Sequence, residues 1–273
     1  MTREIPIKSV KIGGGNPIVL IAGPCVIESE DKAMAAAELI VEAATKLKVP
    51  FIFKSSYDKA NRSSGASFRG PGLEEGLRIL GRIKNTFNVP VISDIHSIEQ
   101  IDPASEVLDV IQIPAFLCRQ TDLLHKAAKC GLPVNVKKGQ FMAPADVKNI
   151  ITKFKEAGSE DLILTERGVS FGYNNLVVDF RSLSIMRPMG YPIVFDATHS
   201  VQLPGGAGTS SSGQRQFVAP LARAAAAVGI DGIFMEVHPC PDEALCDGPN
   251  MVTVPEMVSI MEQVLAVDGA LRG

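Results

Sequence analysis

Tryptophan is absent from this 273-residue chain, aromatic residues make up only 5% of it, and its five cysteines follow no regular spacing. Domains held together by disulfides are short and dense in cysteine, so that class is excluded and we expect reduced thiols. Basic residues are not in excess, because 27 lysines and arginines stand against 30 acidic residues, a formal net charge of −3. An anionic ligand would therefore need a local basic pocket, and a nucleic-acid partner is not expected.

Long apolar segments are also missing. Residues 1–8 carry charges of both signs and lack the apolar core of a signal peptide, and no run approaches the roughly 20 residues that cross a membrane. Hydrophobic residues still make up 46% of the chain, which is enough for a large core. The sequence predicts a cytoplasmic protein that binds small molecules and has no membrane partner.

Eight short apolar runs recur along the chain, and most are followed by a turn and a longer amphipathic segment. The runs are rich in Val, Ile and Phe and nearly continuous, as in strands that are buried on both faces. They cover residues 18–25, 51–57, 89–96, 110–116, 134–139, 162–168, 193–200 and 233–239. Helical patterns, several opening with proline or a capping residue, cover residues 29–46, 73–87, 122–130, 144–157, 214–228 and 254–265.

This alternation predicts an α/β fold, a (β/α)8 TIM barrel, which needs about 250 residues and would use residues 1–273 as a single domain. Residues 5–12, a turn at 13–16 and the first strand are expected to form an N-terminal β-hairpin, so that residues 1–17 cap the barrel bottom. The main alternative is an open, doubly wound sheet. Such a sheet usually has a glycine-rich first turn, and Gly23-Pro24-Cys25 is not a dinucleotide-binding fingerprint.

Polar residues interrupt nearly every apolar run at its C-terminal end. In a TIM barrel these ends share one face, and the active site lies there. Charged residues are rarely buried without a partner or a task, so their common position indicates an active site. The residues are Cys25, Lys54, Asp94, His96, Gln112, Lys137, Lys138, Gln140, Glu166, Arg167, Asp196, His199, Glu236 and His238.

Basic residues dominate one part of this set. Each would be a surface side chain if taken alone, but together they predict a funnel for phosphate and carboxylate groups. Its members are Lys54, Lys59, Arg62, Lys137, Lys138 and Arg167.

A second group combines a thiol, an imidazole and two carboxylates: Cys25, His199, Glu236 and Asp247. These ligand types suit a divalent ion such as Zn2+, Fe2+ or Mn2+. The four become neighbours because strand eight of a barrel pairs with strand one. Alone, Cys25 would be interpreted as a small buried hydrophobe. Cys246 is a less favoured substitute ligand.

Residues 205–213 are rich in glycine and serine and predict a mobile lid, with a phosphate cradle as the alternative.

Seven motifs resemble the 3-deoxy-D-manno-octulosonate-8-phosphate (KDO8P) synthases, and the likeness covers essentially the whole chain. The motifs are AGPCVIES at 22–29, FKSSYDKANRSS at 53–64, QIPAF at 112–116, VKKGQ at 136–140, TERG at 165–168, DATHS at 196–200 and CDGP at 246–249. The resemblance implies a transferase of lipopolysaccharide biosynthesis that condenses phosphoenolpyruvate with D-arabinose 5-phosphate and water, by C–O cleavage without a Schiff base.

The resemblance also implies roles for individual residues. Phosphoenolpyruvate would contact Lys54, Lys59, Gln112, Ala115, Lys137, Gln140 and Arg167. Arabinose 5-phosphate would contact Asn61, Arg62 and Ser63, with Phe116 and Arg119 reaching in from a neighbouring subunit of a homotetramer. The catalytic residues would be Lys59, Lys137, His199 and Asp247.

Metal dependence follows mainly from Cys25, because metal-free members of this family resemble the chain but carry asparagine there. The resemblance then implies Cys25, His199, Glu236 and Asp247 as ligands of Zn2+, Fe2+ or Mn2+.

Other functions remain open at this stage. The related 3-deoxyheptulosonate-7-phosphate synthases use erythrose 4-phosphate, but their second-strand loop usually has Lys-Pro-Arg where this chain has Lys59-Ala60-Asn61-Arg62. A barrel that binds sugar phosphates without turnover, or a lysine Schiff-base aldolase, would also use a basic pocket.

Overall fold

The computed structural model describes residues 1–61, 65, 67–206 and 212–272 of the chain. Its centre is a closed barrel of eight parallel strands, and β14 closes it by pairing with β3 and β11. In barrel order the strands are β3 (Val19–Gly23), β4 (Phe51–Lys54), β5 (Val91–Asp94), β6 (Val110–Ile113), β7 (Val134–Lys137), β8 (Leu162–Glu166), β11 (Ile193–Asp196) and β14 (Gly232–Glu236). The predicted (β/α)8 architecture is confirmed.

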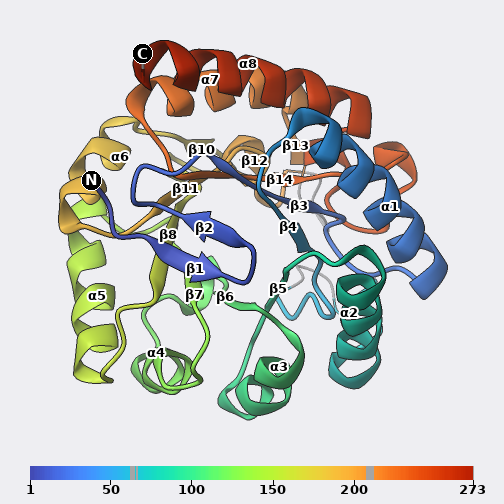
Figure 1. The fold of residues 1–273 in the computed structure, drawn as a ribbon, viewed down its shortest axis with the longest axis horizontal. Helices are drawn as coiled ribbons and strands as arrows, with labels where there is room; N and C mark the ends of the chain where they lie inside the picture. Colours follow the sequence, from blue (N-terminus) through green and yellow to red (C-terminus); the bar gives the residue numbers. More distant parts are fainter. Residues whose placement is uncertain (62–64, 66, 207–211, 273) are drawn as a thin grey trace.

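One helix follows each barrel strand, and the helices form an outer ring around the strands (Figure 1). The helices are α1 (Glu30–Leu47), α2 (Leu73–Phe87), α3 (Ile101–Val107), α4 (Thr121–Ala128), α5 (Val147–Glu156), α6 (Arg181–Met186), α7 (Val218–Val228) and α8 (Val254–Arg272). The sequence did not predict α3 and α6, because seven and six residues are too few to show a helical period. No helix among the described residues is long and apolar enough to cross a lipid bilayer.

The side chains of each strand alternate between the helices and the barrel interior, as the two-residue period of a strand requires. On β4, for example, Phe51 and Phe53 pack in the layer between strands and helices. Ile52 belongs to a separate apolar cluster inside the barrel, and Lys54 follows it on the same face. The strands are therefore buried on both faces, which explains their nearly continuous apolar sequence.

The N-terminal hairpin consists of β1 (Ile5–Ile7) and β2 (Val10–Ile12) and crosses the barrel in Figure 1. Its four apolar side chains pack on apolar residues of the barrel interior, so the expected cap at the barrel bottom is confirmed. The expected turn at 13–16 is present, because the Asn16 N–H donates to the Gly13 carbonyl at 3.0 Å, but it leads into β3 and does not close the hairpin. The hairpin itself reverses earlier, at Lys8, which has φ of 51°. Gly13 instead serves close packing, since a Cβ there would lie 2.1 Å from the Arg3 carbonyl oxygen.

Two short hairpins complete the strands. Strand β9 (Val169–Ser170) pairs with β10 (Leu176–Val177) after β8, and β12 (Gln202–Leu203) pairs with β13 (Ser212–Gly213) after β11. These hairpins lie in the loops that follow the carboxyl ends of the barrel strands. They add structure to the same end of the barrel at which the polar residues gather.

Candidate active site

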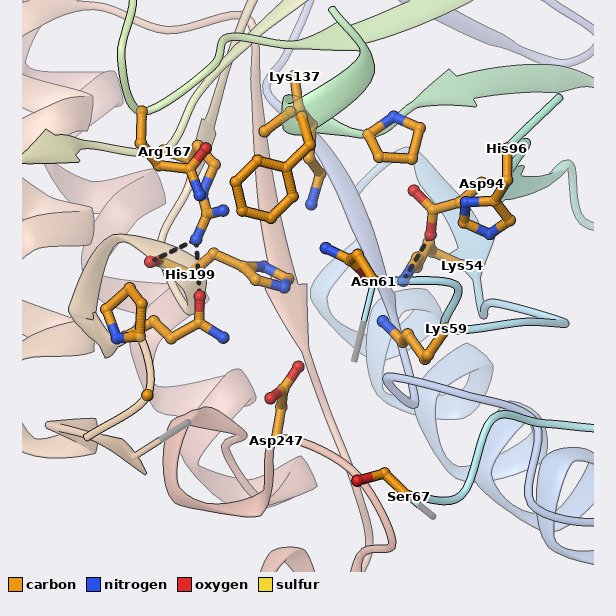
Figure 2. A pocket seen from close by; sticks show the side chains of 17 residues that line it. Lys54, Lys59, Asn61, Ser67, Asp94, His96, Lys137, Arg167, His199 and Asp247 are labelled. Carbon is orange, nitrogen blue, oxygen red and sulfur yellow. Dashed lines mark hydrogen bonds and ion pairs between the residues drawn. The ribbon is translucent and has the colours of Figure 1, made fainter. Parts of the chain in front are cut away.

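A cavity of about 210 Å³ opens at the carboxyl ends of the barrel strands, and polar side chains converge on it from several strands (Figure 2). Because the strands are parallel and the barrel is closed, residues far apart in sequence meet here. The lining residues are Lys54, Lys59, Asn61, Ser67, Asp94, His96, Pro114, Ala115, Phe116, Lys137, Gln140, Arg167, His199, Gln202, Pro204, Gly205 and Asp247.

Two lysines and two carboxylates meet on one side of the cavity. Lys54 Nζ lies 3.5 Å from Asp94 Oδ2 and 3.6 Å from Glu236 Oε1, and Lys59 Nζ lies 3.6 Å from the same Glu236 oxygen. Burial raises the pKa of Glu236, but His199 and the surrounding lysines outweigh it and lower the pKa to about 2. This part of the cavity therefore holds ionised groups at neutral pH.

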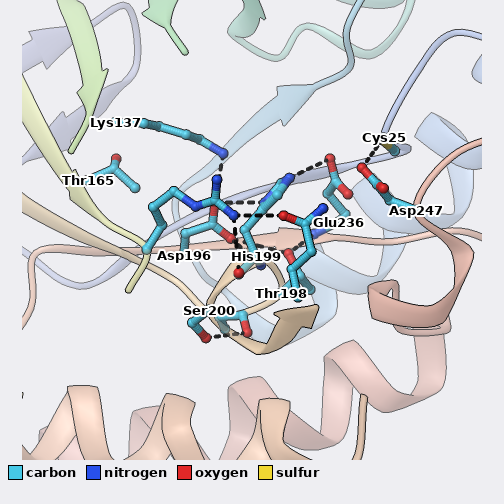
Figure 3. A network of polar contacts seen from close by, with 12 residues as sticks. Cys25, Lys137, Thr165, Asp196, Thr198, His199, Ser200, Glu236 and Asp247 are labelled. Atoms are coloured by element: carbon cyan, nitrogen blue, oxygen red, sulfur yellow. Dashed lines mark hydrogen bonds and ion pairs between the residues drawn. The ribbon is translucent and has the colours of Figure 1, made fainter. Parts of the chain in front are cut away.

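Asp196 connects Lys137 to His199 (Figure 3). Its Oδ2 accepts a hydrogen bond from Lys137 Nζ at 2.7 Å and lies 2.8 Å from His199 Nδ1, while its Oδ1 accepts the backbone N–H of His199 at 2.9 Å. Burial lowers the pKa of Lys137, and Asp196 opposes that effect. Asp196 thus orients both a cation and an imidazole, and leaves His199 Nε2 directed at Glu236 Oε1, 3.5 Å away.

Arg167 follows β8 and projects its guanidinium into the cavity (Figure 2). Its Nη2 donates to Gln202 Oε1 at 2.9 Å and to the His199 carbonyl at 3.3 Å. Its buried Nε has no hydrogen-bond partner among the described residues. Burial lowers the pKa of Arg167, as it does for Lys137. A buried guanidinium with an unused donor is suited to an anionic ligand.

Cysteine and carboxylate side chains meet beside this basic region. Cys25 Sγ lies 2.9 Å from Cys246 Sγ and 3.4 Å from Asp247 Oδ2. Two groups of three residues bring their ligand atoms within 4.8 Å of one another: Cys25 with Cys246 and Asp247, and His199 with Glu236 and Asp247. All four predicted ligands thus belong to these two groups, which share Asp247, and Cys246 joins them (Figure 3).

The chemistry of this cluster fits a divalent cation. Both carboxylate oxygens of Glu236 are buried and accept no hydrogen bond from the described residues, although two lysines lie 3.6 Å from Oε1, so the oxygen lone pairs remain available to a metal ion. Burial and the neighbouring Cys246 thiol raise the pKa of Cys25 well above its ordinary value. A thiolate, an imidazole and carboxylates are ligands that Zn2+ and similar ions accept. These residues can therefore hold a metal.

The structure brings most of the predicted substrate residues together. Those that line the cavity are Lys54, Lys59, Asn61, Ala115, Phe116, Lys137, Gln140, Arg167, His199 and Asp247. Gln112 is fully buried and uses its amide to bind Asp94 and Asn135, and it is not among the lining residues. Arg119 lies elsewhere, beside a separate cavity of about 510 Å³. Arg62 and Ser63 lie outside the described residues, as do residues 207–211 of the predicted lid.

The predicted basic funnel was wrong about Lys138. Lys138 directly follows β7, and its ammonium is buried away from the cavity, where it donates to the Met142 carbonyl at 3.2 Å and lies 3.5 Å from Glu166 Oε1. Glu166 in turn accepts the backbone N–H groups of Arg167 and Gly168. Successive strand residues point to opposite faces, so Lys137 and Lys138 cannot both enter the cavity.

Sequence reasoning missed four lining residues: Ser67, Pro114, Gln202 and Pro204. Three of them lie in loops and Gln202 lies in the two-residue strand β12, so no periodicity indicates the direction of their side chains. It also missed Asn135 and Thr165, which are fully buried inside the barrel. The sequence did contain a signal for both residues. Asn135 lies two positions before Lys137 and Thr165 two positions after Ile163, so each shares the inward face of its strand with that residue.

The sequence model of the DAHP synthetase I family matches residues 3–271. Curated relatives match over 100% of both chains and are named 2-dehydro-3-deoxyphosphooctonate aldolase. The protein from Trichlorobacter lovleyi is 62% identical, that from Geobacter metallireducens 61% and that from Citrifermentans bemidjiense 60%.

Proposed function

Because the chain belongs to the DAHP synthetase I family, we propose that it is the enzyme that condenses phosphoenolpyruvate with D-arabinose 5-phosphate and water to 3-deoxy-D-manno-octulosonate 8-phosphate and inorganic phosphate. The observation that carries this proposal is the gathering of Lys54, Lys59, Lys137 and Arg167 in one buried cavity. The shared name of relatives at about 60% identity favours the eight-carbon product over the seven-carbon one.

In this reaction carbon 3 of phosphoenolpyruvate bonds to the aldehyde carbon, and the aldehyde oxygen takes up a proton. Water adds its oxygen to carbon 2 and loses one proton, which leaves a hydroxyl group there. Phosphate then leaves by cleavage of the bond between its oxygen and carbon 2, and the hydroxyl proton passes to the departing phosphate as the keto group forms. The proposed substrate has a carboxylate and a phosphate, both of which suit cations in a water-poor site. We assign this binding to Lys59, Lys137 and Arg167, with Lys54, Gln112, Ala115 and Gln140 around them.

Lys137 and Lys54 also bear on the Schiff-base alternative. Lys137 Nζ is bonded to Asp196 at 2.7 Å, and Lys54 Nζ lies within 3.6 Å of two carboxylates. Both nitrogens are therefore engaged by carboxylates and are not left free to attack a carbonyl carbon. His199, held by Asp196, is the side chain we assign to proton transfer, with Asp247 opposite it. Borohydride added with substrate is expected to trap no covalent adduct.

We propose Cys25, His199, Glu236 and Asp247 as the ligands of Zn2+, Fe2+ or Mn2+. When bound, such an ion supplies Lewis-acid polarisation of a carbonyl group and lowers the pKa of water. Asp196 fixes the His199 ring through Nδ1, so that Nε2 is the nitrogen directed at Glu236. The thiol proton of Cys25 must leave before the sulfur can act as a ligand.

The second substrate is assigned to the outer part of the cavity. Asn61 lines it on the loop after β4, and Arg62 and Ser63 follow directly in the sequence. Phe116 is 55% exposed at the rim, so it is available to a neighbouring subunit. Together with Arg119, it is our candidate for the residue pair that one subunit contributes to another in a homotetramer.

Phosphate release from phosphoenolpyruvate and arabinose 5-phosphate tests the proposal. The protein is treated with EDTA and assayed before and after addition of Mn2+ or Zn2+, with erythrose 4-phosphate as the competing aldehyde. Release that depends on the metal and on arabinose 5-phosphate supports both the reaction and the metal site. Release without metal retains the reaction and refutes the metal requirement. Faster release with erythrose 4-phosphate, or none with either aldehyde, would refute the proposed reaction.

A further inference from the structure

A row of polar side chains crosses the barrel interior beneath the cavity. Thr165 Oγ1 donates to Asn135 Oδ1 at 2.6 Å, Asn135 Nδ2 donates to Gln112 Oε1 at 3.0 Å, and Gln112 Nε2 donates to Asp94 Oδ1 at 2.6 Å. These residues belong to β8, β7, β6 and β5, and strand register places Gln112 directly beside both Asn135 and Asp94. The first three side chains are fully buried.

The row has one direction, and Asp94 sets it. An ionised carboxylate only accepts hydrogen bonds, so Gln112 must turn its NH2 group toward Asp94 and its oxygen toward Asn135. Asn135 must then present its NH2 group to Gln112, which leaves its oxygen facing Thr165. The Thr165 hydroxyl satisfies that oxygen by donating. Reversal of either amide would put two oxygens in contact at a buried position, which is unfavourable.

At its other oxygen, Asp94 meets the group that the row positions. Asp94 Oδ2 accepts the Ser56 hydroxyl at 2.5 Å and lies 3.5 Å from Lys54 Nζ, and Lys54 Nζ donates to Ser56 Oγ at 2.9 Å. Lys54 and Asp94 both line the cavity, whereas Thr165, Asn135 and Gln112 do not. The row of hydrogen bonds therefore ends at Asp94 and Lys54, which face the cavity.

We propose that Thr165, Asn135 and Gln112 are positioning residues whose one-directional hydrogen bonds hold the Asp94 carboxylate in place and thereby aim the Lys54 ammonium into the cavity. The inference rests on the proposed function, because phosphoenolpyruvate is the anion that Lys54 would meet. It changes the role of Gln112 from a direct ligand contact to a link between Asn135 and Asp94.

Substitution of Thr165 tests the start of the row. Thr165→Val keeps the shape of the side chain but removes the donor, so Asn135 Oδ1 is left buried without its hydrogen bond. We expect the Kd of phosphoenolpyruvate, measured by calorimetry, to rise roughly 10-fold, while Thr165→Ser, which keeps the hydroxyl, restores most of the affinity. Ser93→Ala is the matched control, because Ser93 is buried on β5 and its hydroxyl has no partner among the described residues.

A double-mutant cycle separates positioning from a general loss of structure. Thr165 and Asp94 are connected through two amides, so additive effects are expected if the row transmits nothing. If the row acts through Asp94, Thr165→Val weakens phosphoenolpyruvate binding far less in an Asp94→Asn background than in the natural protein. Equal fold losses in both backgrounds, or equal affinities of the Val and Ser variants, would overturn the inference.

The outcomes also separate this inference from the proposed function. Phosphate release by the unmodified protein is measured in parallel. If that protein binds phosphoenolpyruvate but releases no phosphate with arabinose 5-phosphate, the proposed reaction fails and the affinity ratios still decide the role of the row. Unmodified protein that binds no phosphoenolpyruvate would overturn both.

Discussion

The two ends of the barrel interior are filled by different kinds of side chain. On β4 the inward-facing residues are Ile52 and then Lys54, and on β11 they are Val194 and then Asp196. The lower residues join the apolar hairpin in one cluster, whereas the upper ones carry charge. A shift of two residues along a strand therefore changes the interior from apolar to ionic.

The two ends differ in what they contribute. Apolar burial at the bottom stabilises the fold by about 25 cal/mol per Å² removed from water. Buried charges at the top lose hydration and recover it only in part through their mutual contacts, as Glu236 illustrates, because its oxygens have ionic neighbours but accept no hydrogen bond from the described residues. The charged side chains at the top therefore contribute less to stability than the apolar ones and remain available to bind a ligand. Substitutions at the top should lower activity, and substitutions at the bottom should lower stability.

The largest effect is expected at Lys137. Lys137→Met removes a buried cation that we assign to phosphoenolpyruvate, and it leaves Asp196 without its closest partner. We expect kcat/KM to fall about 100- to 1,000-fold, as for loss of one charge-stabilising group in other active sites. Phosphate release, normalised to folded protein by circular dichroism, is the measurement. Turnover within a few-fold of the unmodified protein would refute the assignment.

Lys138, the residue directly after β7, provides the matched control. Lys138→Met breaks a buried pair with Glu166 on the outer face, which costs about 3–5 kcal/mol when one partner is left behind. The melting temperature should therefore fall more than for most surface substitutions, while kcat of the folded fraction changes much less than in Lys137→Met. A loss of kcat equal to that of Lys137→Met would show that the two faces of β7 are not functionally distinct.

The next effect concerns the metal. Cys25→Ala removes a proposed ligand, and since loss of even an outer hydrogen-bond partner costs 10- to 100-fold in affinity, we expect metal binding to weaken by at least about 10-fold. Cys246→Ala is compared with it, because Cys246 lies 2.9 Å from Cys25 but is not in the proposed ligand set. Metal content after dialysis against a chelator is measured by mass spectrometry. A larger loss in Cys246→Ala would exchange the two assignments.

The opposite pattern is expected at the barrel bottom. Ile12 is fully buried, and its Cδ1 lies 3.2 Å from the position that a Cβ on Gly232 would take, so it fills the space that this glycine leaves. Ile12→Ala should lower the free energy of unfolding by about 2–5 kcal/mol and leave kcat unchanged. Chemical denaturation and phosphate release measure the two quantities. Lys11→Ala, on the exposed face of the same strand, should change neither, and a fall in kcat for Ile12→Ala would contradict the division.

The barrel and much of its polar end could be predicted because both follow from strand periodicity. Doubly buried parallel strands are short apolar runs, and a lysine or aspartate at the end of such a run is conspicuous, as at Lys54 and Asp196. The same periodicity says that Lys137 and Lys138 face opposite ways, but not which one faces inward. Asn135, two residues before Lys137 and equally polar, is the side chain that indicates the inner face.

Loop geometry could not be predicted in this way. The glycines at 13–15 correctly indicated a turn there, but the hairpin closes earlier, at the left-handed residue Lys8. Asp247 also has a positive φ, of 51°, which brings it close to both Cys25 and His199. No pattern of glycine or asparagine marks Lys8 or Asp247 as a left-handed residue, so neither conformation could be predicted from the sequence.

The smallest effect is expected outside the barrel, at Glu30 on α1. Hydrogen bonds from Arg78 and Arg82 of α2 lower the pKa of Glu30 from 4.5 to about 2. A carboxylate with a lowered folded-state pKa contributes stability that is fully present above pH 4.5 and is lost as the pH falls toward 2. Glu30→Gln should therefore melt slightly below the unmodified protein at pH 7, and the difference should shrink in that acid window. Since the contacts of Glu30 with the two arginines are exposed to solvent, salt should reduce the difference in melting temperature as well.

Glu38→Gln on the same helix is the control, because Glu38 has no ion pair with another described residue. A difference that stays constant from pH 7 to pH 2 would show that Glu30 acts through its shape and not its charge.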